Sequence, residues 1–524
     1  MEFDSLIRNG TVIDGGGRNP GFAADIGITY GRVAAIGHLP DASAARIIDA
    51  TGQVVSPGFI DVHLHSEVAL LDKPNPLRFG ALKQGVTTHL LAPDGFGWTH
   101  LNERRRREMW QYTLFSHGAA DLGEPWPSAE SYLSLFEGAS PANVVPQVPH
   151  LPIRLAVMGW DARPATDTEI EAMKPLVREW LAGAVAFNTG LDYQPAAYAD
   201  THELVELSRL AAAEGAFYAA HIRYGDLGKA GAWQETFEIA REAGTPVHIS
   251  HEHVDAVTTP LLEEAETSCD LTFESYMYPA GCTHLAMMLP TWAQAGGAEA
   301  VLDRIRDDKT RQTLGEVLED RLTGANAPKD LIVAANQSGR WIGESFFQIA
   351  QSEAISAGAL ALKMIEEEHP YALMVFHQPV QGAALDERIR STIQHPRMMV
   401  ASDGVYHSTF GHPRSTGCFA RALRLCVREM GAVSLEQAVF KMSGFPAERF
   451  KIPARGLLRE GFAADVVIFD PDTVTDLATW EKPQSDPTGI SMVMVNGEIV
   501  VDVGVPTDAT PGRVLRRQDY GRPA

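Results

Sequence analysis

Five side chains that could bind a metal ion each stand at the end of a short apolar run. His63 and His65 close VVSPGFIDVHLH, His221 follows AFYAA, His251 follows VHIS, and Asp403 follows MMVAS. Residues i and i+2 of a strand face the same side, so His63 and His65 can point the same way. Each residue alone is more simply a hydrogen-bonded histidine or a loop-capping aspartate. Together, imidazoles and a carboxylate predict a site for one or two divalent ions, with zinc as the best fit.

The apolar runs predict the strands that must position these side chains. They are short, nearly continuous and separated by segments with helical spacing, as buried parallel strands are. Eight such runs are present: VVSPGFIDVHLH, GVTTHLLAPD, IRLAVMGWD, GAVAFNTG, GAFYAAHIRY, TPVHISHEH, LTFESYMYP and RMMVASDG. The stretches THELVELSRLAAAEG and ETFEIAREAG fit amphipathic helices that end at glycine. We therefore expect an α/β fold, a (β/α)8 TIM barrel with its active site at the carboxyl ends of the strands.

The two ends of the chain have a different sequence pattern. Short β-branched runs alternate with Asn-Gly and Gly-Gly turn signals near both termini. We expect residues 1–57 and 446–524 to form one small β-sandwich beside a barrel of residues 58–445. The interval before RMMVASDG is too long for one crossover, so an inserted subdomain is expected at about 282–345, with an additional strand in YALMVFH.

Composition narrows the class of partner. The chain has 524 residues, with 44 basic and 67 acidic side chains and a net charge of -23. Neither nucleic acid nor a membrane is expected as a partner, because a basic face and a long apolar span are both missing. The acidic start MEFDSLIRNG does not resemble a signal peptide, and 4 cysteines are too few for a disulfide framework. A cytoplasmic enzyme with a small-molecule substrate is the expectation, and a homo-oligomer is compatible with it.

Several sequence blocks resemble the amidohydrolase superfamily, and within it the N-acyl-D-amino-acid deacylase (D-aminoacylase) branch. The resemblance runs from NGTVIDGGG and SPGFIDVHLH to FAADVVIFD and VNGEIV, with FNTGLDYQPAAYAD, AAHIRY, PVHISHEH, ASDG and GHPRSTG between them. It implies that His63 and His65 bind the more exposed metal position and that His221 and His251 bind the tighter one. Asp403 would take the proton from the attacking water and pass it to the leaving nitrogen.

The resemblance also implies an anchor for a substrate carboxylate, formed by Tyr193 and Arg414. An arginine offers a planar fork that suits a carboxylate, although a structural ion pair is the plainer alternative for Arg414. The family pattern HISHxK has His253 in place of its lysine here, which weakens the anchor because histidine can be neutral at pH 7. Tyr278 could line the same pocket, or simply pack.

A second departure from the family pattern concerns the metal site. The branch carries a cysteine after the second strand (GVTTxxxxNCG), whereas this chain reads GVTTHLLAPDG and has Asp94 there. A carboxylate can ligate or bridge zinc, so the metal site survives this exchange. The alternative is that Asp94 only caps the PDG turn.

The sequence thus predicts hydrolysis of a linear amide in an N-acyl amino-acid-like substrate. Because loops on one barrel support many reactions, hydrolysis of a cyclic amide and deamination are the alternatives. A metal-free barrel kept as a binding module would lack some of the predicted ligands.

Overall fold

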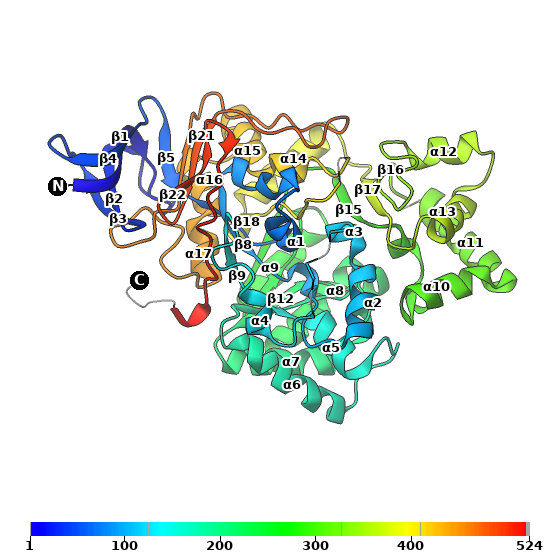
Figure 1. Cartoon of the computed structure of the whole chain (residues 1–524). Coiled ribbons are helices and arrows are strands. Elements are labelled where there is room, and N and C mark those ends of the chain that lie inside the picture. Colours follow the sequence, from blue (N-terminus) through cyan, green and yellow to red (C-terminus); the bar gives the residue numbers. More distant parts are fainter. Residues whose placement is uncertain (1, 121, 124, 326, 409, 520–524) are drawn as a thin grey trace.

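The computed structural model describes residues 2–120, 122–123, 125–325, 327–408 and 410–519. Figure 1 shows a central barrel, a β-rich region at one side where the blue and red ends of the chain meet, and a green-yellow helical region at the other side. None of the described helices is long and apolar enough to cross a membrane.

The barrel consists of parallel strands that follow one another around a ring. Two sheets contribute, in the orders β6-β8-β9 and β10-β11-β12-β13-β14-β18. The strands are β6 (Phe59–Asp61), β8 (Val86–Leu90), β9 (Asn143–Val145), β10 (Val148–Pro149), β11 (Ala186–Gly190), β12 (Phe217–His221), β13 (Val247–Ile249), β14 (Leu271–Ser275) and β18 (Met398–Val400). β9 and β10 are two halves of the third strand, because β9 pairs with β8 and β10 pairs with β11. These strands are buried throughout, as expected for parallel strands covered on both faces.

The ring closes between its first and eighth strands. β7 (Leu64–His65) pairs in parallel with β19 (Gly404–Val405). Just before this pair, the backbone N–H of Asp403 donates to the carbonyl of His63 over 2.7 Å. The predicted TIM barrel is confirmed, and its closure brings two of the expected metal ligands together.

Helices follow the strands and cover the barrel. They include α6 (Asp167–Leu181), α7 (Thr201–Ala213), α8 (Tyr224–Ala243), α9 (Thr258–Ser268), α14 (Ala383–Gln394) and α16 (Leu435–Met442). The Asp200 side chain accepts from the backbone of Glu203 and so caps α7. The two sequence stretches predicted to be helical lie in α7 and α8, and those predictions are confirmed.

One predicted strand is wrong. The run IRLAVMGWD lies largely in α5 (His150–Met158), and the third strand lies just before it. A short buried apolar run cannot be assigned to strand or helix by periodicity alone. The helix buries Arg154, whose Nε lies 3.2 Å from the Glu203 carboxylate, and His150 contacts the same carboxylate at 2.9 Å.

Strands from both ends of the chain share one nine-stranded sheet. Its order is β23-β22-β21-β20-β5-β1-β2-β3, with β4 paired to β1. The strands are β1 (Glu2–Val12), β2 (Phe22–Thr29), β3 (Arg32–Gly37), β4 (Ser43–Asp49), β5 (Val54–Pro57), β20 (Val466–Phe469), β21 (Ile490–Val495), β22 (Glu498–Asp502) and β23 (Val505–Pro506). Residues of seven of these strands enclose a core of their own that includes Ile26, Val55 and Ile468.

The two Asn-Gly pairs have different structural roles in this sheet. Asn496 and Gly497 have φ values of 49° and 84° and join β21 to β22 as a hairpin. Asn9 has a φ of 61° but lies inside β1, where the pairing with β2 shifts between Ile7 and Gly10. This pair therefore makes a β-bulge rather than a turn.

The packing of side chains does not divide at the expected domain boundaries. These boundaries stay predictions. Ala447 and Phe450 share a core with the barrel residues Ile60 and Phe217, although they lie beyond residue 445. Near the end of the described chain, Val514 bridges to Val144 of the third barrel strand.

The inserted region has its own sheet and core. Its antiparallel sheet has the order β15-β17-β16, formed by β15 (Ala280–His284), β16 (Asp330–Ala335) and β17 (Leu373–His377). The helices α10 (Gly297–Arg306), α11 (Asp308–Thr323), α12 (Phe346–Ser352) and α13 (Ala357–Glu367) pack with it around a core that runs from Leu285 to Met374. The region is thus longer than 282–345, and the strand expected in YALMVFH belongs to it rather than to the barrel.

Candidate metal centre

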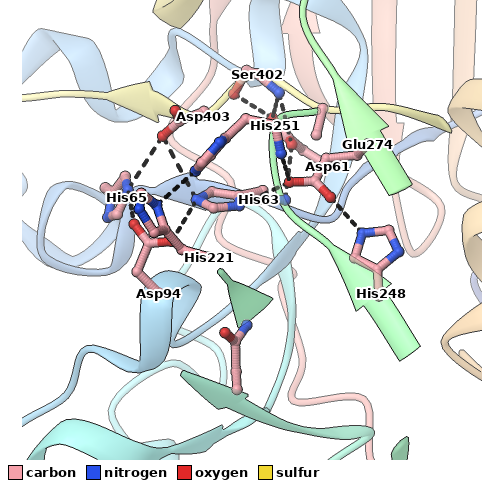
Figure 2. A network of polar contacts seen from close by, with 12 residues as sticks. Asp61, His63, His65, Asp94, His221, His248, His251, Glu274, Ser402 and Asp403 are labelled. Carbon is pink, nitrogen blue, oxygen red and sulfur yellow. Dashed lines mark hydrogen bonds and ion pairs between the residues drawn. The ribbon is translucent and has the colours of Figure 1, made fainter. Parts of the chain in front are cut away.

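The six predicted ligands meet at the carboxyl ends of the barrel strands. They come from the β6–β7 segment (His63, His65), the loop after β8 (Asp94), the end of β12 (His221), the loop after β13 (His251) and the segment between β18 and β19 (Asp403). Figure 2 shows these side chains turned toward one another from different strands. Barrel enzymes place their reacting groups at this end.

Asp94 lies at the centre of the cluster. Its Oδ1 is 3.5 Å from His63 Nε2 and 3.8 Å from His221 Nδ1, and its Oδ2 is 3.6 Å from His65 Nε2. One carboxylate thus faces ligands from both expected metal positions, which is the geometry of a bridging group. The residue is 2% exposed, so it is more than the cap of a surface turn.

Asp403 faces the same point from the opposite side. Its Oδ1 lies 3.3 Å from His65 Nε2 and 3.6 Å from His63 Nε2. Its Oδ2 forms an ion pair of 2.7 Å with Arg414 Nη2. Arg414 is therefore paired with the candidate proton acceptor, and both the carboxylate anchor and the ion pair stay as interpretations of this residue.

Two acidic residues fix the orientation of the imidazoles. His63 Nδ1 lies 3.0 Å from Glu274 Oε1, and His221 Nε2 lies 3.0 Å from Asp192 Oδ2. An ionised carboxylate only accepts hydrogen bonds, so each of these ring nitrogens carries the proton. The other ring nitrogen, His63 Nε2 or His221 Nδ1, is then left as a lone-pair donor toward the cluster, as metal-binding histidines require.

Two buried atoms at the centre have no hydrogen-bond partner within the part of the chain that the structure describes. They are His63 Nε2 and Asp94 Oδ1, which face each other beyond hydrogen-bond distance. Ligand atoms of His63, Asp94 and His251 lie within 4.8 Å of one another, and so do those of His63, His65 and Asp403. Unpaired buried polar atoms are costly unless something binds them. The donor set fits one divalent ion, or two ions that share Asp94.

The electrostatics of the cluster favour added positive charge, which a proton on His63 or a bound metal ion can supply. Burial alone would lower the pKa of His63, but the carboxylates of Asp94, Glu274 and Asp403 outweigh burial and raise that pKa well above its usual value. Burial opposes ionisation of Asp94, yet His63 and the neighbouring imidazoles lower its pKa to about 2. Burial and His221 lower the pKa of His251 to about 4. The carboxylates are therefore ionised, and this density of negative charge attracts a cation.

Three of the six ligands have a left-handed backbone. The φ values are 53° for Asp94, 40° for His251 and 48° for Asp403. Non-glycine residues rarely adopt this conformation, and they do so most often where function needs a particular side-chain direction. The Asp94 loop is held by Glu67, whose buried carboxylate accepts from the backbone N–H of Ala92.

The four predicted substrate contacts lie at different distances from the ligands. The Tyr193 ring is 5.1 Å from the His221 ring, and Arg414 contacts Asp403. His253 is turned toward Ser275, with Nδ1 2.8 Å from the serine Oγ. Tyr278 contacts the His412 and Arg421 side chains rather than any ligand.

Sequence reasoning missed the positioning residues. Glu274 also accepts from the backbone N–H of His251 over 2.8 Å and lies 2.5 Å from His248 Nε2, so it links two ligands to a third histidine. A glutamate in the middle of the apolar run LTFESYMYP was the available signal. Asp192 lies just after β11 and was not singled out in the sequence.

The comparisons with known proteins agree with this geometry. The model of the amidohydrolase family matches residues 46–501. The D-aminoacylase of Alcaligenes xylosoxydans xylosoxydans is 34% identical over 98% of each chain. The N-acyl-D-glutamate deacylase of the same organism is 33% identical over 98% of this chain and 97% of its own.

Solved structures of related proteins match this chain over nearly its full length. The N-acyl-D-glutamate deacylase of Bordetella bronchiseptica, complexed with zinc and a phosphonate mimic of the tetrahedral intermediate, has a TM-score of 0.81 and 30% identity, covering 98% of this chain and 100% of that one. A D-aminoacylase structure has a TM-score of 0.80 with 31% identity and the same coverage. A D-hydantoinase, at 16% identity and a TM-score of 0.56, shares the fold alone. The fold and the site define a metal-dependent hydrolase. The chain belongs to the amidohydrolase family.

Proposed function

We propose that this protein deacylates N-acyl-D-amino acids by metal-assisted hydrolysis of the amide bond. The observation that carries the proposal is the convergence of six ligands on one point, where His63 Nε2 and Asp94 Oδ1 are buried without a partner. The relatives aligned along nearly the whole chain are deacylases of this class.

Two groups of residues would each bind one metal ion. Asp94, His221 and His251 would hold one ion, and His63 and His65, with Asp403 nearby, would hold a second. A divalent ion such as zinc, when bound there, activates a water molecule and polarises the amide carbonyl.

Asp403 is the proposed proton carrier. Its carboxylate would accept a proton from the attacking water at Oδ1, the oxygen that faces His65 and His63. It would then deliver that proton to the leaving amide nitrogen. Burial opposes ionisation of Asp403, but Arg414 and the imidazoles keep its pKa well below the usual value, so the carboxylate is ionised at neutral pH.

Arg414 is the proposed anchor for the substrate carboxylate. Its Nη2 contacts Asp403, whereas Nε and Nη1 are buried without a hydrogen-bond partner among the described residues. Tyr193 stays a candidate for the same role. His253 is a neutral contact at most, because burial, Arg388 and Lys229 hold its pKa well below the usual value. Tyr278 is the weakest candidate, since its ring packs against His412.

A cytoplasmic location is part of the proposal. All four cysteines are free, as is usual for proteins of a reducing compartment.

The test is an assay of protein loaded with zinc, cobalt or manganese in turn. Matched N-acetyl-D- and N-acetyl-L-amino acids should be compared with a hydantoin of the same side chain, by direct detection of the released amine. We expect turnover of the D-isomer to exceed that of the other two. Turnover of the hydantoin alone would overturn the proposal.

A further inference from the structure

A pocket of about 530 Å³ lies where the N-terminal part of the chain meets two helices of the barrel. Its wall is formed by the loop 16–18 between β1 and β2, by the end of α14, by residues 432–433 and by α16. Figure 1 shows α16 on the side of the barrel that faces the sheet made from both termini. None of the six candidate metal ligands is among the described residues that line the pocket, so it is separate from the metal centre.

A glycine allows the loop 16–18 to lie directly against α16. Gly17 has a φ of 74°, which other residues rarely adopt, and a Cβ on it would lie 2.7 Å from the Phe440 side chain. Asp14, just before the loop, accepts from the Gly16 N–H over 2.7 Å and is part of the same turn. The loop therefore holds Arg18 beside the helix.

Lys441 of α16 is a buried cation in the wall of this pocket. The residue is 7% exposed, and its Nζ donates to the carbonyls of His395 and Met398 over 2.7 and 3.0 Å. Within the described ranges it forms no ion pair, and burial without a nearby carboxylate lowers its pKa to about 8. An ammonium has three N–H donors, so one of them is left for a ligand. A buried charge of this kind is stabilised by an anion.

The rest of the lining adds a second cation and further N–H donors. Arg18 is exposed at the rim, and its guanidinium has no partner in the part of the chain that the structure describes. Gln394 Nε2 donates to the Ala432 carbonyl, and Gln437 Oε1 accepts from the Ser434 N–H, which leaves amide N–H groups for a ligand. No aspartate or glutamate is among the described lining residues. In a chain with a net charge of -23, such a hollow favours an anion.

We propose that this pocket binds a small oxyanion, phosphate or a carboxylate, between Lys441 and Arg18. Lys441 supplies the buried N–H contact, and the planar fork of Arg18 closes over the anion from the rim. Lys441 contacts β18 at its amino end, whereas Asp403 follows the carboxyl end, so the site does not depend on the proposed hydrolysis. An anion held between the loop and α16 binds only the folded chain and should stabilise it.

The first test follows the unfolding temperature of the metal-loaded full chain as sodium phosphate is added. Sodium acetate is the second arm, and sodium chloride at equal ionic strength is the control, because screening acts in all three. We expect one or both oxyanions to raise the unfolding temperature in a saturable manner beyond the effect of chloride. The arm with the larger shift identifies the preferred anion. No shift beyond that of chloride in either arm overturns the proposal.

A variant of the rim separates binding in this pocket from general effects of the salts. Oxyanions also stabilise proteins by exclusion from the surface, and that effect is the same in a variant of one pocket residue. Arg18→Ser should weaken the affinity for the preferred anion, measured by isothermal titration calorimetry, by about tenfold or more. Arg459→Ser, at another exposed arginine, is the matched control and should keep the wild-type affinity. Equal affinities in the two variants would overturn the assignment.

A second variant removes the buried cation. Lys441→Met has an apolar side chain of similar length, and we expect it to lose the saturable response, whereas Lys441→Arg keeps the charge and should retain part of it. A response of wild-type size in Lys441→Met would contradict the proposal. Where Lys441→Met does not fold, the comparison of Arg18→Ser with Arg459→Ser still decides.

Discussion

At the residue scale, the candidate centre has a carboxylate, that of Asp94, where the pattern of the family that the sequence resembles has a cysteine. The two oxygens of Asp94 lie 3.5–3.8 Å from ring nitrogens of His63, His65 and His221, which belong to both expected metal positions. A cysteine would offer one sulfur atom in place of these two oxygens. The prediction that Asp94 replaces the cysteine as a ligand fits this geometry and stays a proposal. Carboxylate is a harder ligand than thiolate, so the centre should accept manganese or cobalt more readily than a thiolate site would.

Removal of the proposed proton carrier should separate binding from catalysis. Asp403→Asn keeps the shape of the side chain but cannot accept a proton. We expect the variant to retain metal and to lose about a thousandfold or more in kcat, within the range of general acid–base catalysis. Metal content and kcat should be measured on the same preparation. Near-normal kcat would remove Asp403 from the mechanism.

Loss of a positioning residue should weaken metal binding. Glu274→Gln can no longer fix the proton on His63 Nδ1, and we expect a 10- to 100-fold loss of metal affinity. The affinity can be measured by competition with a chromogenic chelator. Glu266→Gln, at an exposed glutamate of α9, is the matched control and should bind metal normally. Equal affinities in the two variants would contradict the role given to Glu274.

At the element scale, local patterns predict most of the scaffold. The runs that end in His63, His221, His251 and Asp403 lie at barrel strands, because burial on both faces leaves a continuous apolar signal. The same signal fails at α5, where a buried helix packs its Arg154 on Glu203 and looks equally apolar. Asp192 and Glu274 could not be paired with their histidines from sequence, because each contact joins different barrel strands whose side-chain directions only the folded chain fixes.

The packing of α16 on β18 gives a prediction about pH. Lys441 of α16 donates to the carbonyls of His395 and Met398 at 2.7 and 3.0 Å, and burial lowers its pKa from 10.5 to about 8. Between pH 8 and 10.5 the unfolded chain holds this proton and the folded chain has lost it. The free energy of unfolding should therefore rise with pH across this window, by at most about 3 kcal/mol from this group.

Comparison with Lys441→Met isolates this effect from other titrating groups. Urea unfolding of both proteins at pH 7.5, 9 and 10 should show wild type gaining stability relative to the variant as pH rises. Parallel pH dependences would show that the lysine keeps its ordinary pKa in the folded protein.

At the scale of the whole molecule, three regions meet around one centre. The barrel supplies the ligands, the inserted region supplies β15, and the sheet made from both termini packs beside the barrel (Figure 1). Metal ions that together join ligands from five strands should stabilise all of the barrel, since they bind only the folded chain.

Metal removal should therefore lower stability as well as activity. At a free metal concentration 100 times Kd, the bound ion contributes about 2.7 kcal/mol, and dialysis against a chelator should remove that contribution and lower the unfolding temperature. Reloading should restore both. In His221→Ala, which lacks one proposed ligand, we expect a smaller shift; an identical shift would place the stabilising ion elsewhere.

The most direct test is anomalous diffraction from crystals of zinc-loaded protein, recorded on both sides of the zinc absorption edge. The account predicts at least one strong anomalous peak about 2.0–2.2 Å from an oxygen of Asp94, with His221 and His251 nitrogens at similar distance. It would be contradicted by metal-loaded crystals with no anomalous peak within reach of Asp94, His63, His65, His221 and His251.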